Sequence, residues 1–177
     1  MFEQTSPRLR IPSESYDGME ASDPVFRRRM VVLMGVRQRS TQWALTLIVV
    51  AGLAVDAWVH FDLASAFAQV KTSTLSQEDL FHVDAIAAIV AAVALLVRPR
   101  RYTAAFAFLV AASGTVAVVL YRYVDVGAIG PIPNMYDPYW APTGKTVSVF
   151  AEAIAALAAL SLFALLNSGA RRKRLDA

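Results

Sequence analysis

The chain has 177 residues, a formal net charge of +3 at pH 7 and a hydrophobic fraction of 56%, a composition that indicates one membrane-embedded unit rather than a soluble domain. Because it contains no cysteine, disulfides, thiolate metal sites, iron–sulfur clusters and cysteine nucleophiles are excluded. The basic residues stand beside apolar stretches, where positive charge sets membrane orientation, so we expect no nucleic-acid partner.

The chain begins with two polar segments. Residues 1–23 combine acidic residues and prolines with few apolar side chains, which predicts a disordered cytoplasmic tail. Residues 24–41 mix arginines with apolar residues, a pattern that fits a basic, amphipathic juxtamembrane helix at the lipid headgroups. The alternative is a charged lead-in that only orients the first membrane span.

Four apolar runs follow, each about as long as a bilayer crossing requires. A basic turn at 98–101 and a proline-containing loop at 124–146 separate the later runs. We therefore predict an all-α, polytopic membrane protein, a four-transmembrane-helix bundle within residues 42–168, followed by a basic cytoplasmic tail at 169–177. The predicted spans are residues 43–63, 81–97, 102–121 and 147–166.

The positions of lysine and arginine predict the orientation. Seven of these residues precede the first run, three lie in the turn at 98–101, and four follow the last run. Only three lie in the two other connections, at Lys71, Arg122 and Lys145. Because cytoplasmic segments carry the excess of positive charge, fourteen against three predicts both termini in the cytoplasm and the two longer loops outside.

Alanines recur at four-residue spacing within the runs, as in Ala87 with Ala91 and Ala107 with Ala111. In lipid, small residues at this spacing let helix backbones approach closely, so we expect a tight bundle. The same alanine-rich faces, with the basic cytoplasmic ends, also suit docking onto another membrane protein or a second copy of the chain.

Ionisable residues gather toward the outer ends of the runs. A charge inside a bilayer costs at least ~2.5 kcal/mol on insertion scales and usually faces the bundle interior or water. The helix rise places Asp56 and Glu152 roughly 9 Å inside the outer boundary, deep enough to need partners. The predicted outward-facing polar cluster consists of Asp56, His60, His82, Asp84 and Glu152.

The spacing of these residues allows a metal site. Asp56 and His60 are four residues apart and share one helix face, and Ser76 with Asp79 fits a capped helix start. Two histidines with carboxylates can bind zinc, copper or ferrous iron. Two alternatives stay open: a structural ion network in which Arg122 neutralises Glu152 or Asp56, and proton-linked or ligand-binding use of the same residues.

The second outward loop, residues 124–146, is rich in glycine, proline, tyrosine and tryptophan. This composition predicts an ordered cap at the membrane interface. A cap in this position is able to cover the acidic pocket.

The segments VDAWVHFDLA, LFHVDAIAAIVAAVALLVRPRR and LYRYVDVGAIGPIPNMYDPYW resemble uncharacterised small four-helix integral membrane proteins of high-GC actinobacteria, over residues 42–166. The resemblance implies a bacterial plasma-membrane location and carries no activity to transfer. No nucleophile with a base is recognisable, so we expect a non-enzymatic membrane protein whose polar cluster is a structural ion network able to bind a divalent metal or protons. The alternatives are an accessory subunit of a larger membrane complex and a small-solute or ion transporter acting as an oligomer.

Overall fold

The computed structural model describes residues 24–175, and the chain divides between Ser40 and Thr41 into two units. Across the described residues the regular structure is helical, which confirms the all-α fold class. The predicted tail at 1–23 lies outside the described residues. The helices are α1 (Pro24–Ala64), the short 3-10 helix η2 (Ser65–Phe67), α2 (Gln77–Val97), α3 (Arg101–Tyr123) and α4 (Thr143–Leu175).

Among residues 24–175, four helices are long and apolar enough to cross a membrane, which agrees with the predicted number of spans. Each helix begins before its predicted span, and α1, α3 and α4 also end beyond it. The apolar run marks only the part suited to lipid, and the backbone stays helical past it. The first unit illustrates this, since residues 24–40 are helical; their predicted position at the headgroups stays a prediction. The candidate spans are Gly35–Phe67, Gln77–Val97, Arg101–Tyr123 and Thr143–Gly169.

Local side chains fix where α2 begins, as the sequence predicts. The Asp79 backbone N–H donates to the Ser76 hydroxyl (3.0 Å) and the Ser76 backbone N–H donates to the Asp79 carboxylate (2.9 Å). This reciprocal capping box satisfies two backbone donors that the first helical turn leaves free. The start of α2 is therefore set independently of the membrane boundary.

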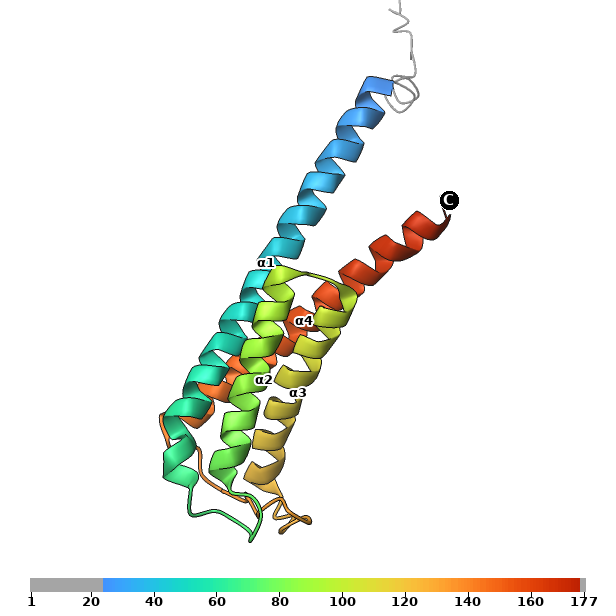
Figure 1. Ribbon diagram of the computed structural model, residues 1–177. Coiled ribbons are helices and arrows are strands. Elements are labelled where there is room, and N and C mark those ends of the chain that lie inside the picture. Colours follow the sequence, from blue (N-terminus) through green and yellow to red (C-terminus); the bar gives the residue numbers. More distant parts are fainter. Residues whose placement is uncertain (1–23, 176–177) are drawn as a thin grey trace, which may run out of the picture. The chain divides into compact units, whose positions relative to one another are not determined.

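In the second unit, residues 41–175, the four helices are bundled together (Figure 1), and all four contribute side chains to one apolar core. Alanines dominate it, and an added Cβ at Gly52 of α1 would lie 2.8 Å from the Ala151 carbonyl oxygen of α4. The backbones of these two helices thus approach closely, as the small-residue pattern predicts. The core is formed by residues such as Val49, Leu53, Ala88, Ala91, Leu95, Ala107, Ala111, Ala155, Ala159 and Leu162.

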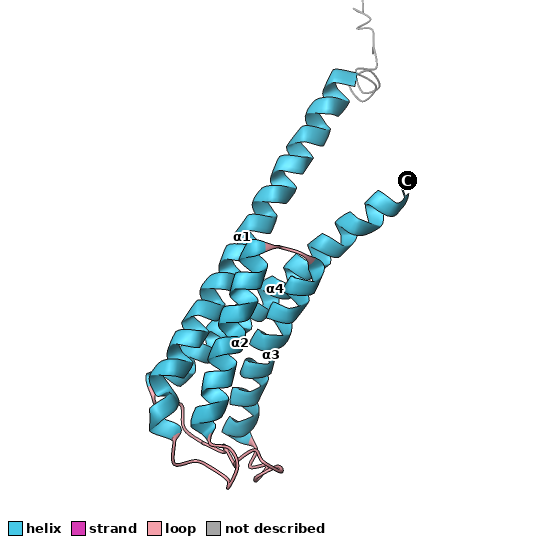
Figure 2. Ribbon diagram, viewed as in Figure 1, coloured by secondary structure: helices cyan, strands magenta, loops and turns pink. Residues whose placement is uncertain are grey.

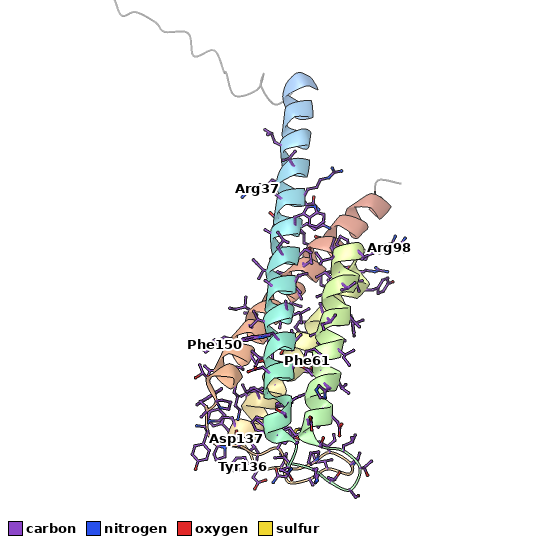
Figure 3. The ribbon with its side chains drawn as sticks, turned by 60° about the vertical axis from the view of Figure 1, so that its left-hand side comes forward. Arg37, Phe61, Arg98, Tyr136, Asp137 and Phe150 are labelled. Atoms are coloured by element: carbon purple, nitrogen blue, oxygen red, sulfur yellow. The ribbon has the colours of Figure 1, made fainter. Side chains whose placement is uncertain are left out.

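The connections lie at opposite ends of this bundle (Figure 2). The short turn at 98–100 closes one end, and the longer segments 65–76 and 124–142 meet at the other. These two segments are joined by a hydrogen bond from the Thr72 hydroxyl to the Pro131 carbonyl (2.8 Å). Figure 3 shows Arg98 at the first end and Asp137 at the second. We call the second end the loop end.

Candidate functional site

Asp56 and His60 lie on the inner face of α1, in the half of the bundle nearer the loop end. Their four-residue spacing places them one turn apart, and His60 Nδ1 lies 2.8 Å from Asp56 Oδ1. The same nitrogen is 3.0 Å from the Asp56 carbonyl oxygen. Both side chains are buried, so this predicted pair exists and sits inside the protein.

Helix α4 adds a second buried pair through Ser148 and Glu152. The Ser148 hydroxyl lies 3.0 Å from Asp56 Oδ1 and 2.5 Å from Glu152 Oε1, so it bridges the two carboxyl groups. Glu152 is fully buried, and its Oε2 has no hydrogen-bond partner among the described residues. Gly114 of α3 makes room for it, since an added Cβ there would lie 2.7 Å from Oε2.

Asp84 reaches the same place from α2. Its Oδ2 lies 3.6 Å from His60 Nδ1 and has no hydrogen-bond partner within the described part of the chain. One potential ligand atom from each of Asp56, His60 and Asp84 lies within 4.8 Å of the other two. The structure therefore gathers a polar cluster that we define as Asp56, His60, Asp84, Ser148 and Glu152.

The polar cluster carries an excess of acidic groups. It contains three carboxyl groups and one imidazole, and the ion pairs found within residues 24–175 bring no lysine or arginine to it. The ion pair that does contain a lysine joins Lys145 Nζ to Asp137 at 2.9 Å. Charge neutrality in the cluster therefore requires protons on the carboxyl groups or a bound cation.

The structure does not bring His82, which the sequence placed in the cluster, together with Asp56, His60 and Asp84. His82 and Asp84 are two residues apart, which turns them by about 200° around the helix axis, so only one can face inward. Asp84 does, whereas the partly exposed His82 ring lies against Phe61, with ring centroids 5.8 Å apart. His60 is thus the single histidine of the cluster.

The predicted ion pair between Arg122 and Glu152 is also not formed. The Arg122 guanidinium lies over the rings of Tyr123 (5.0 Å) and Trp140 (5.6 Å). Glu152 meets α3 at Gly114, eight residues or about 12 Å before Arg122 along the helix. The arginine lies at the end of α3, too far along the helix axis to neutralise the buried acid.

A cavity of about 380 Å³ lies beside the polar cluster, between the helices and the loop end. Residues of the 124–146 segment line it, including Ile132, Met135 and Asp137. The Asp137 backbone N–H also bonds to the Tyr121 carbonyl at 3.0 Å. The segment is therefore an ordered wall of the cavity, and His60, Asp84 and Ser148 line the cavity from the helices.

Ser148 and Gly114 belong to the site but are not among the residues predicted from the sequence. The four-residue spacing from Ser148 to Glu152 is a signal that could have found the serine, because it places both on one face of α4. Gly114 has no comparable signal, since its role depends on which face of α3 meets α4.

The arrangement offers nitrogen and oxygen ligands to a metal ion, and hydrogen-bonded carboxyl groups to protons. It lies in the half of the helical bundle that carries the longer loops. No protein-family model, curated protein or solved structure matches the chain.

Proposed function

We propose that this chain is a plasma-membrane protein of a bacterium, with both termini in the cytoplasm, that binds a divalent transition metal in its polar cluster. The fourteen-to-three bias of lysine and arginine supports the orientation. In that orientation the loop end and the cluster face the outside of the cell. The metal would reach the cluster from the outer side.

The observation that carries the proposal is the convergence of three ligand atoms from Asp56, His60 and Asp84 within 4.8 Å. Metal–nitrogen and metal–oxygen bonds of about 2.0–2.2 Å in a tetrahedral site place ligand atoms roughly 3.4 Å apart. The distances from His60 Nδ1 to the two carboxylates, 2.8 Å and 3.6 Å, bracket this spacing. To admit an ion, His60 Nδ1 would exchange its contact with the Asp56 carbonyl oxygen (3.0 Å) for a bond to the metal.

Charge also supports a divalent ion. The Ser148 hydroxyl has one hydrogen, so it can donate to only one of the two carboxyl groups that it touches. For both contacts to be hydrogen bonds, the other carboxyl group must carry a proton and donate it to Ser148. That proton, a neutral His60 and a divalent cation together balance the three acidic groups.

Metal analysis of the protein purified in detergent without a histidine tag tests this proposal. After dialysis against a trace-metal mixture, we expect about one metal per chain in the parent and in His82→Ala, whose histidine lies outside the cluster. His60→Ala should lose the metal. A parent chain without metal, or equal loss in both variants, would contradict the proposal.

A second candidate is a structural network that holds protons instead of a metal, and the Ser148 bridge favours it. Continuous contacts run from Glu152 through Ser148 and Asp56 to His60. Ser148→Ala breaks this chain while leaving the three metal ligands in place. If Ser148→Ala loses stability but keeps its metal, Ser148 belongs to the structural network and not to the metal site. If the parent holds no metal and Ser148→Ala still loses stability, the structural network alone is favoured.

A further inference from the structure

The cavity beside the polar cluster is too large to be explained by a metal ion. Its volume of about 380 Å³ falls within the roughly 300–1,000 Å³ range of small-molecule sites. Most metal-site volume is filled by the ligands themselves, so a cluster that only held an ion would need no such space. The volume of the cavity is therefore consistent with a second, larger ligand.

The walls of the cavity are mainly apolar and partly aromatic. Leu63, Leu80 and Val118 contribute aliphatic surface, and Phe81 and Tyr121 contribute rings from neighbouring helices. The Phe81 ring is held edge-on against His60, with ring centroids 4.9 Å apart. Such walls suit an apolar or aromatic molecular body, and their ring faces also attract cations.

The polar groups at the cavity favour a positive charge. The Asp84 side chain is 26% exposed and lines the cavity, and it faces no lysine or arginine in the described ion pairs. Lys145 is the lysine that lines the cavity, and it is already engaged. Its Nζ donates to the Asp137 carboxylate (2.9 Å) and to the carbonyls of Asp137 (3.2 Å) and Tyr139 (3.1 Å). These three bonds use all the hydrogens of the ammonium group.

We infer that this cavity binds a small organic cation, a protonated amine on an apolar or aromatic body, with its ammonium group at Asp84. The body lies against the walls formed by Phe81, Tyr121 and the aliphatic residues. An organic anion would meet the acidic cluster while Lys145, the cation that lines the described cavity, is already engaged. A neutral molecule would bring no charge to balance the excess of acidic groups. The inference does not rest on metal binding, but amine and metal compete because both use Asp84.

The test uses 2-phenylethylamine as the probe, with phenylacetate and 2-phenylethanol as its anionic and neutral counterparts. Binding to chelator-treated protein in detergent is measured by calorimetry at neutral pH, and empty micelles correct for partition. We expect the amine to bind at least tenfold more tightly than the alcohol, and phenylacetate to be the weakest. Equal binding of all three probes, or tightest binding of phenylacetate, would overturn the inference.

Variants separate the charge from the cavity. Asp84→Asn keeps the shape of the side chain and should weaken amine binding at least tenfold, whereas Asp62→Asn, an exposed acid of the same bundle, should not change it. Ala117→Phe adds a ring at the cavity wall while leaving the Asp84 carboxylate in the sequence, and it should also abolish binding. Unchanged amine affinity in Asp84→Asn or in Ala117→Phe contradicts the site.

Competition distinguishes this inference from the proposed metal site. In chelator-treated protein, added Zn²⁺ should weaken amine binding in proportion to its occupancy. A protein that retains metal but never binds the amine keeps the proposed function and loses the inference. A protein that binds the amine but never holds metal keeps the inference and loses the proposed function.

Discussion

The two halves of the helical bundle differ in what fills their interior. Toward the 98–100 turn, small and aliphatic side chains fill the interior, with Ala88, Ala91, Leu95, Ala107 and Leu162 fully buried. Toward the loop end, the interior holds the polar cluster and a cavity of about 380 Å³. The ionisable side chains that are buried within the described residues, Asp56, His60 and Glu152, all lie in this second half.

The two halves contribute differently to the stability of the bundle. In lipid, helices associate through close contacts rather than through release of water, and the alanine-rich half supplies such contacts. Each buried charge costs at least ~2.5 kcal/mol on insertion scales, so the polar half adds a cost that packing alone does not require. Stability should therefore respond differently to changes in the two halves.

The largest expected effect comes from Asp56→Ala in the polar half. The substitution removes the partner of both His60 and Ser148 and leaves buried polar groups unpaired. We expect a loss of about 3 kcal/mol, as when one partner of a buried ion pair is removed, measured by thermal unfolding in detergent. Asp62→Ala at an exposed site of the same helix is the control, and a parent-like Asp56→Ala would show that the buried contacts stabilise nothing.

Gly52→Ala disturbs the close packing of α1 against α4. The new methyl group would lie 2.8 Å from both the Ala151 carbonyl oxygen and the Ala155 methyl carbon, and one of these is backbone, so the helices must separate. Overpacking of this kind costs up to about 3 kcal/mol, and because alanine favours the helix by nearly 1 kcal/mol we expect a net loss of about 2 kcal/mol. Gly35→Ala is the matched control because its Cβ meets nothing within 4 Å; equal melting of the two variants would argue against the close approach.

Gly114→Ala tests the contact between α3 and the polar cluster. Its methyl group would displace the Glu152 carboxylate, which lies 2.7–2.8 Å away, while alanine favours the helix by nearly 1 kcal/mol. We expect a net loss of about 1 kcal/mol, because the Ser148 contact is weakened. Combining it with Glu152→Ala should remove the clash, so additive losses in a double-mutant cycle would refute the contact.

The smallest effect is expected from Ser76→Ala at the start of α2. It removes the hydroxyl that accepts from the Asp79 N–H, and because the cap is exposed the loss should be about 0.5 kcal/mol. Hydrogen exchange should increase only in the first turn of α2. A change in metal content or in amine binding would mean that the cap also positions Asp84.

Local sequence patterns determined much of this architecture. Within the described residues, length and hydropathy determine four helices that are long and apolar enough to span a membrane, because a bilayer crossing demands a long apolar helix. The four-residue spacing of Asp56 and His60 determines their pairing, and Ser76 with Asp79 determines the start of α2. Each of these features depends on one helix and its own hydrogen bonds.

Tertiary structure decided which residues complete the site. Helix α2 has apolar residues all around its circumference, so its sequence leaves open whether His82 or Asp84 turns inward. Which residues contact Glu152 depends in the same way on the axial position at which α4 packs against α3. Ser148 and Gly114 lie beside Glu152, whereas Arg122 lies about 12 Å beyond Gly114 along α3. Hydropathy indicates that a helix is long and apolar enough to cross a membrane, whereas the rotation and axial position of each helix follow only from packing against its neighbours.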